Sequence, residues 1–162
     1  MSLTVGNKLP VASLGRLGAD GPEQVDLNAM IEGKKVVIFA LPGAFTPTCS
    51  SAHMPSFIRT AGQLRDKGVD QIICISVNDI FVMKAWADAT GATDADIHCL
   101  ADGDSAFTVA IGMDYSAPET GMISRSKRYA MIVEGGTITV LNVEEARGVC
   151  DISGGETILD LL

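Results

Sequence analysis

The segment at residues 42–50, Pro-Gly-Ala-Phe-Thr-Pro-Thr-Cys-Ser, places a cysteine near the expected start of a helix. Thr46 is a suitable N-cap residue, and Pro47 suits the first helical position, where its missing N–H costs no hydrogen bond. Cys49 is then the third helical residue, where the partial positive charge of the helix N-terminus favours a thiolate over a thiol. The Thr46 hydroxyl, three residues earlier, can approach the sulfur. This spacing indicates a reactive cysteine, although taken alone it more often marks a capped helix with an inert core cysteine.

Arg128 is the cation that could support such a sulfur. A free thiol with a pKa near 8.5 is about 3% ionised at pH 7, so complete ionisation raises the thiolate population only ~30-fold, and an efficient enzyme needs hydrogen-bond donors as well. Arg128 opens an expected strand and shares one face with Ala130 and Ile132, because side chains alternate along a strand. It either lies at a solvated strand end, which is more usual, or points at an anion. Arg125 and Lys127 precede it in a loop and are weaker candidates.

The remaining cysteines and the two histidines form no cofactor or reductase motif. The four cysteines stand at positions 49, 74, 99 and 150 without a Cys-x-x-Cys pair, which argues against a disulfide reductase of the thioredoxin type. Neither His53 nor His98 completes a metal-ligand spacing with a second close pair, so we expect no metal. In a reducing compartment such cysteines are seldom structural disulfides, so each is either an inert thiol or a redox group.

Apolar periodicity predicts alternating strands and helices over most of the chain. Residues 34–41 and 71–77 include β-branched apolar runs typical of central strands, and Glu134-Gly135-Gly136 predicts a hairpin. The expected elements are a strand at 34–41, a helix from 47 to about 65, a strand at 71–77, a helix from 79 to about 90, a strand at 97–101, a helix at 105–111, strands at 128–133 and 137–142, and a helix at 155–162. Right-handed βαβ crossovers make the first part of the sheet parallel, and the hairpin makes the last part antiparallel. The predicted fold class is therefore α/β, a thioredoxin-like fold with a mixed central sheet and helices on both faces.

Size and charge exclude several classes of protein. The 162 residues fit one hydrophobic core, so we expect a single domain over residues 1–162. A net charge of -8 disfavours binding to nucleic acid or to anionic membranes. The longest uninterrupted apolar run, residues 36–41, is too short to span a bilayer, and the N-terminus lacks the features of a secretion signal. We therefore expect a cytoplasmic protein.

The segment around Cys49 resembles that of a known family. The pattern Pro42-x-x-x-Thr46-x-x-Cys49 is similar to the active-site pattern of peroxiredoxins. The longer string at 42–50, with His53 and Pro55, resembles the type II (atypical two-cysteine, peroxiredoxin 5-like) subfamily. Further resemblance runs through 75–79 (Ile-Ser-Val-Asn-Asp), 81–86 (Phe-Val-Met-Lys-Ala-Trp), 128–131 (Arg-Tyr-Ala-Met) and 141–144 (Leu-Asn-Val-Glu). The closing stretch at 150–157 resembles bacterial members that depend on glutaredoxin.

The resemblance implies a thiol-specific peroxidase that serves redox homeostasis and antioxidant defence. The Cys49 thiolate would attack a peroxide and become a sulfenic acid, reducing hydrogen peroxide or alkyl hydroperoxides to water and alcohols. Thr46 and Arg128 would orient the thiolate and the peroxide, and Pro42 would shield the pocket from water. His53 is either a supporting residue or a hydrogen-bonded helix residue near a dimer face. No metal or organic cofactor is implied.

Three routes could return the sulfenic acid to the thiol. In the route that we favour, a small thiol or glutaredoxin reduces Cys49 directly, and the resemblance implies glutaredoxin, glutathione or thioredoxin as the regenerating system. Plant-like members use a resolving cysteine that matches Cys74, and animal-like members use one near the C-terminus, where Cys150 lies. Cys74 stands among isoleucines, and a bridge to Cys49 would require the helix to unwind. We interpret Cys99, which follows His98 on a short strand, as a packing residue.

A different class of function would use the same sulfur. A peroxide sensor or redox-controlled binding protein would pass the oxidation of Cys49 to a partner, and would need a partner-binding extension or a large apolar patch. Neither is evident in the sequence. Type II members commonly pair as noncovalent homodimers, so we expect a homodimer.

Overall fold

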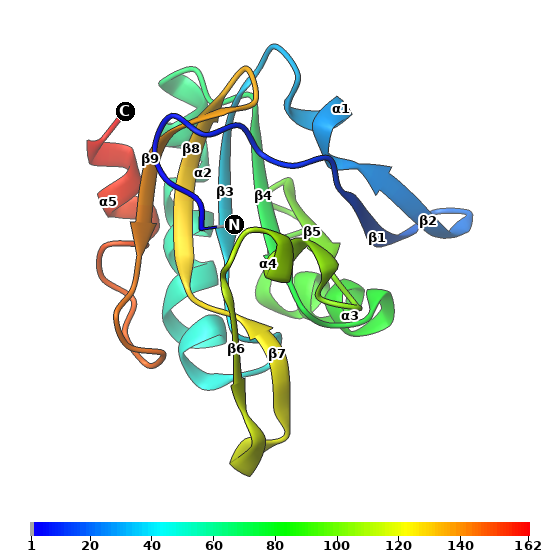
Figure 1. Cartoon of the computed structure of the whole chain (residues 1–162). Coiled ribbons are helices and arrows are strands. Elements are labelled where there is room, and N and C mark those ends of the chain that lie inside the picture. Colours follow the sequence, from blue (N-terminus) through cyan, green and yellow to red (C-terminus); the bar gives the residue numbers. More distant parts are fainter. Residues whose placement is uncertain (1) are drawn as a thin grey trace.

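The computed structural model describes residues 2–162 and alternates strands with helices along most of that length (Figure 1). The elements, in chain order, are β1 (Ser13–Gly18), β2 (Gly21–Asp26), α1 (Leu27–Ile31), β3 (Lys35–Ala40), the π-turn η1 (Cys49–His53), α2 (Met54–Asp66), β4 (Gln71–Ser76), α3 (Ile80–Thr90), β5 (Ile97–Ala101), α4 (Ala106–Ala110), β6 (Asp114–Ala117), the 3-10 turn η2 (Pro118–Thr120), β7 (Met122–Ser126), β8 (Tyr129–Glu134), β9 (Thr137–Val143) and α5 (Gly155–Asp160).

Seven of the strands form one mixed sheet in the order β2-β1-β5-β4-β3-β8-β9. The central strands β3, β4 and β5 run parallel, as the crossover rule predicts, whereas β8 and β9 add antiparallel pairs at one edge. The β8–β9 hairpin turns at Gly135 and Gly136, both with positive φ, which glycine adopts without strain. The thioredoxin-like fold and the hairpin expected from the sequence are thus confirmed.

Two apolar layers sandwich the sheet. On one face, buried side chains of α2, α3 and α5 pack on the strands, and Cys49 lies in this layer. On the other face, α1, α4 and the N-terminal segment cover the strands. Because β3 and β4 are buried on both faces, their sequences are apolar without alternation. None of the helices in residues 2–162 combines the length and apolar character that a bilayer crossing requires.

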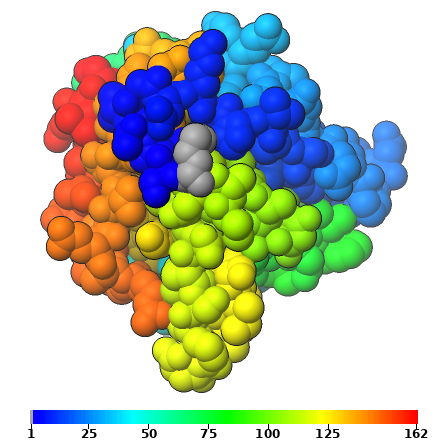
Figure 2. All heavy atoms as spheres, viewed as in Figure 1, coloured from blue at the N-terminus to red at the C-terminus, as the bar shows by residue number. Residues whose placement is uncertain are grey.

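Several elements were not expected from the sequence. The β1–β2 hairpin lies at the sheet edge, and β2 is largely exposed and contains Pro22, so it shows no apolar alternation. Helix α1 is too short for a helical period to show. The β6–β7 hairpin forms a separate two-stranded sheet and projects from the body of the molecule (Figure 2). Its irregular register and half-exposed residues explain why no strand pattern is visible in this part of the sequence.

The contact between α5 and α2 depends on a missing side chain. The Gly155 N–H donates to the Ser56 Oγ at 2.9 Å, and a Cβ added at Gly155 would overlap the Ser56 carbonyl oxygen and the Thr60 hydroxyl. The two helices therefore approach more closely than any other residue would permit.

We predict that Gly155→Ala lowers the free energy of unfolding by about 1–3 kcal/mol, because the extra carbon meets a helix backbone that cannot move aside. Gly62→Ala is the matched control, since a Cβ at this exposed position of α2 meets no atom within 4 Å and should stabilise the helix by about 0.5–1 kcal/mol. Urea unfolding of the two variants measures both values. Equal stabilities would contradict this account of the α2–α5 contact.

Candidate active site

Cys49 lies in the first turns of the helix that follows β3, and these turns are not regular α-helix. The Ser50 N–H donates to the Thr46 carbonyl at 3.1 Å, so the helix starts after Thr46, as expected for the N-cap position, but the Thr46 hydroxyl donates to the Gly43 carbonyl. From Cys49 to His53 the helix widens into a π-turn, in which the Met54 N–H donates to the Cys49 carbonyl. The uninterrupted α-helix expected here is therefore wrong.

Pro55 gives the physical reason for the π-turn. Proline has no N–H to donate, and in an α-helix its ring clashes with the carbonyl four residues earlier. A wider turn just before it relieves that clash. The turn is braced from α3, where the buried Trp86 indole N–H donates to the Ser50 hydroxyl at 3.0 Å.

Arg128 meets the sulfur directly. Its Nη2 donates to the Cys49 Sγ at 3.3 Å, and both side chains are buried. Arg128 immediately precedes β8 instead of opening it, and Ala130 and Ile132 of β8 lie in the same apolar layer as Cys49. The alternative of a solvated strand end is therefore wrong, and the predicted alternation correctly placed these side chains on one face.

His53, one turn after Cys49, is hydrogen-bonded to the second terminal nitrogen of the guanidinium, Nη1. Arg128 Nη1 lies 3.0 Å from His53 Nδ1, and His53 Nε2 lies 3.0 Å from the Ser153 carbonyl oxygen. Because an arginine only donates and a carbonyl only accepts, the imidazole must be neutral with its proton on Nε2. Burial, together with the Arg128 charge, lowers the pKa of His53 from 6.5 to about 3, against the opposing effect of the Ser153 carbonyl.

The Arg128 charge is buried without a carboxylate. Its remaining contact is from Nη2 to the Arg147 carbonyl at 3.2 Å, and no ion pair within residues 2–162 includes Arg128. Its Nε is buried and has no partner in the described part of the chain. A buried cation is costly unless an anion compensates it. The Cys49 sulfur is in direct contact with the guanidinium, so Arg128 is positioned to interact with negative charge that develops on that sulfur.

The loop at residues 42–46 forms one wall of a cavity that Arg128 also lines. The Thr46 hydroxyl donates to the Gly43 carbonyl at 2.7 Å, so its hydrogen goes to the loop and not to the sulfur as the spacing had suggested. The Asn78 side chain accepts from the Ala44 N–H at 3.0 Å, and Arg125 Nη1 donates to the Pro42 carbonyl at 3.2 Å. The loop is therefore fixed from β7 and from the segment after β4.

A cavity of about 310 Å³ opens beside this wall. Pro42, Thr46 and Arg128 line it, which brings these three predicted residues to one opening. Cys49 itself is not part of the lining, and it is almost fully buried in contact with Arg128. A small molecule in the cavity would therefore meet the arginine next to the sulfur.

Residues after β9, which the sequence analysis did not assign to the site, position His53. One Glu144 carboxylate oxygen accepts from the Asp151 N–H at 2.7 Å, the Ser153 N–H at 2.9 Å and the Ser153 hydroxyl at 2.8 Å. These bonds fix the position of the Ser153 carbonyl, which accepts the hydrogen bond from the Nε2–H of His53. The only sequence signal was Glu144 at the end of the Leu-Asn-Val-Glu string, which carries no spacing rule of its own.

Neither of the two possible resolving cysteines is hydrogen-bonded to Arg128 within residues 2–162, although the Arg128 charge acts on both. Cys74 is fully buried on β4, and burial raises the pKa of its thiol. Cys150 is half-buried in the segment after β9, and burial raises its pKa as well. Across residues 2–162 no cluster of three or more metal-ligating side chains occurs.

Comparison with known proteins decides the family. A family model described as Redoxin matches residues 4–159. Rice (Oryza sativa subsp. japonica) peroxiredoxin-2C is 46% identical over 161 residues, which cover 99% of this chain and 98% of the relative. The chain belongs to the peroxiredoxin family.

Two further similarities support this assignment. The chloroplastic peroxiredoxin-2E-2 of rice is 47% identical to this peroxiredoxin over 165 residues, covering 99% of the chain and 73% of the relative. The crystal structure of reduced Prx3 from Vibrio vulnificus in complex with hydrogen peroxide superposes with a TM-score of 0.91 at 47% identity, covering 98% and 95% of the two chains. Homologues of this kind support thiol peroxidase activity.

The buried neutral His53 predicts a pH dependence of stability in this peroxiredoxin. Between pH 6.5 and about 3 the unfolded chain binds a proton at His53 that the folded chain does not, so folding stability falls as the pH falls through this window. We expect this residue to contribute a slope of about 1.4 kcal/mol per pH unit. Urea unfolding at pH 4–7 measures the free energy of unfolding of wild type and of His53→Gln. Subtracting the two values at each pH cancels the contribution of carboxylates that both chains share. Parallel stability curves would contradict the assignment of a neutral, buried imidazole.

Proposed function

We propose that this protein is a peroxidase in which the Cys49 thiolate reduces hydrogen peroxide and small alkyl hydroperoxides. The thiolate attacks one peroxide oxygen, the O–O bond breaks, and Cys49 becomes a sulfenic acid. The departing oxygen takes from solvent the proton that the thiol released on ionisation and leaves as an alcohol or water. One observation carries the proposal: the buried, carboxylate-free guanidinium of Arg128 lies 3.3 Å from the Cys49 sulfur.

Arg128 has two roles in this proposal. Before reaction it donates a hydrogen bond to the Cys49 sulfur and orients it, and during reaction it stabilises the negative charge that moves onto the leaving oxygen. The Nε, which has no partner among residues 2–162, is one donor available for a peroxide oxygen. His53 remains neutral at physiological pH, so it orients the guanidinium without cancelling its charge.

The cavity in front of the site favours small substrates. Its mouth combines Pro42 and Met122 with the polar groups of Thr46 and Arg128, which suits a peroxide group attached to hydrogen or to a short alkyl chain. The Vibrio vulnificus relative, described as a complex with hydrogen peroxide, supports this choice.

For regeneration we propose direct reduction by an external thiol, with glutaredoxin plus glutathione favoured over thioredoxin. The first thiol displaces water from the sulfenic acid to form a mixed disulfide with Cys49, and a second thiol releases Cys49 and carries away the disulfide. A bridge from the fully buried Cys74 to Cys49 would require the helix to unwind, and burial raises the pKa of Cys150, which disfavours Cys150 as the attacking thiolate. This is the glutaredoxin-dependent, type II behaviour that the closing segment suggests.

The peroxide chemistry predicts a sharp difference between two arginine variants. Cys49→Ser should abolish peroxide consumption. Arg128→Lys should lower kcat/KM for hydrogen peroxide by about 100-fold or more. A lysine cannot make the contacts to His53, Arg147 and Cys49 at the same time. Arg59→Lys is the control, since Arg59 forms an exposed ion pair with Glu156 on the surface. Stopped-flow peroxide consumption measures all three. Near-wild-type rates for Arg128→Lys would remove the basis of the proposal.

The regeneration route predicts that Cys74→Ser and Cys150→Ser keep their turnover with glutathione plus glutaredoxin. A coupled assay that follows NADPH oxidation through glutathione reductase measures this, with a parallel thioredoxin assay for comparison. Loss of turnover in either variant would identify that cysteine as a resolving residue and would replace the direct route.

The cytoplasmic location and the homodimer remain predictions. Sedimentation velocity of the purified chain would test the second.

A further inference from the structure

Two cysteines outside the candidate active site face each other across the centre of the sheet. Cys74 on β4 and Cys99 on β5 are direct partners in the parallel register, so their side chains lie on the same face. Adjacent strands are about 4.8 Å apart, which is within the roughly 4.4–6.8 Å range of Cα separations that a disulfide bridges. This pair therefore needs no unwinding to meet, unlike Cys74 and Cys49.

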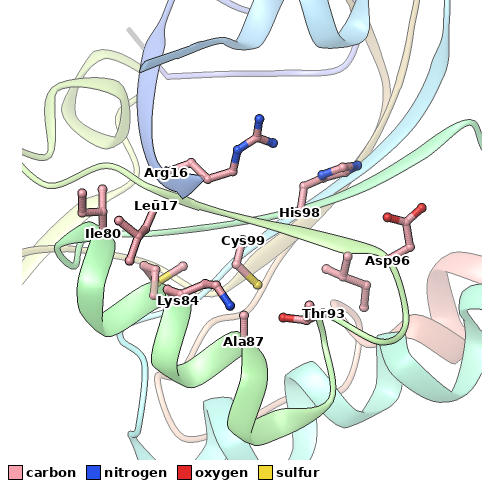
Figure 3. Close-up of a pocket in the computed structure, with 11 residues that line it drawn as sticks. Arg16, Leu17, Ile80, Lys84, Ala87, Thr93, Asp96, His98 and Cys99 are labelled. Atoms are coloured by element: carbon pink, nitrogen blue, oxygen red, sulfur yellow. The ribbon is translucent and has the colours of Figure 1, made fainter. Parts of the chain in front are cut away.

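The two thiols differ in access. Cys74 is fully buried, whereas Cys99 is half-buried and lines a cavity of about 200 Å³ between β5 and α3. Figure 3 shows the Cys99 sulfur pointing into this cavity, toward the side chains of Lys84 and Thr93. Arg16 from β1 also lines it. An oxidant in solvent can thus reach Cys99 before it reaches Cys74.

We propose that Cys74 and Cys99 form a second redox site, a dithiol that peroxide oxidises to a cross-strand disulfide. A hydroperoxide oxidises the Cys99 thiol to a sulfenic acid and leaves as an alcohol, or as water if it is hydrogen peroxide. The Cys74 sulfur then attacks the Cys99 sulfur, the S–OH bond breaks, and the Cys74 proton leaves with the hydroxyl as water.

Burial sets the order of these steps. Burial is the main cause that raises the pKa of Cys74, and a hydrogen bond with the Cys99 thiol is the second cause. Cys74 therefore stays protonated until a sulfenic acid forms beside it. Cys99 is therefore the entry thiol and Cys74 the resolving thiol of this pair.

The disulfide would limit which thiols can reduce oxidised Cys49. Once Cys74 is bonded to Cys99 it cannot resolve Cys49, so strong oxidation would leave external thiols as the route that restores Cys49. The inference does not depend on Cys49 chemistry, and its test removes that residue.

The sequence makes the test direct, because trypsin separates all four cysteines. They fall in the peptides 36–59, 68–84, 85–125 and 148–162, so each possible disulfide joins a different pair. Reduced Cys49→Ser protein is treated with excess hydrogen peroxide, its free thiols are alkylated during denaturation, and the digest is analysed by mass spectrometry without reductant. We expect the 68–84 and 85–125 peptides to appear linked, two hydrogen atoms lighter than their sum. Mixing isotope-labelled and unlabelled protein distinguishes a bond within one chain from a bond between chains.

Matched variants complete the experiment. Cys74→Ser and Cys99→Ser should each lose the linked peptide, and Cys150→Ser should keep it. Wild-type protein gives the same readout if Cys49→Ser does not fold. The test uses peroxide levels that fully oxidise Cys49 in the wild type. If Cys74 is then recovered alkylated, with Cys99 either alkylated or oxidised to the sulfinic acid, the proposal is overturned. The peroxidase function would remain intact.

Discussion

The site rests on one uncompensated charge. Burying a guanidinium without a carboxylate costs several kcal/mol, and the fold accepts this cost at Arg128. A carboxylate in contact with Arg128 would remove the cost, but it would also neutralise the charge that the Cys49 sulfur experiences. The electrostatics of the site therefore depend on the surrounding groups remaining neutral.

The rest of the site can be understood as support for that charge. His53 accepts a hydrogen bond from Arg128 as a neutral ring. The Arg147 and Ser153 groups that complete the network are backbone carbonyls. The Glu144 carboxylate binds the Ser153 segment. Carbonyls and a neutral imidazole satisfy donors without adding a negative charge. Three separate parts of the chain, the helix after β3, the start of β8 and the segment after β9, must fold before this network exists.

The sequence predicted the central strands, the long helices and the β8–β9 hairpin because burial on both faces or on one helical face leaves a clear apolar period. It could not predict β2 or the β6–β7 hairpin, whose residues are largely exposed and follow no period. For the site, Cys49 followed from helix-start chemistry, and Arg128 from strand alternation plus the family resemblance. The role of Ser153 could not be predicted, because its contribution is a main-chain carbonyl that any residue type would supply. The π-turn had a visible cause in Pro55, but the helical period around it hid the irregularity.

The hydrogen bond between Trp86 and Ser50 has a consequence for observing the enzyme. The chain contains a single tryptophan, and its indole is fully buried with its N–H bound to the residue next to Cys49. Any rearrangement of the first turn must lengthen or break that bond and alter the polarity around the indole. The ultraviolet emission of the unlabelled protein is thus an intrinsic reporter of the geometry around the sulfur, with no other indole to obscure it.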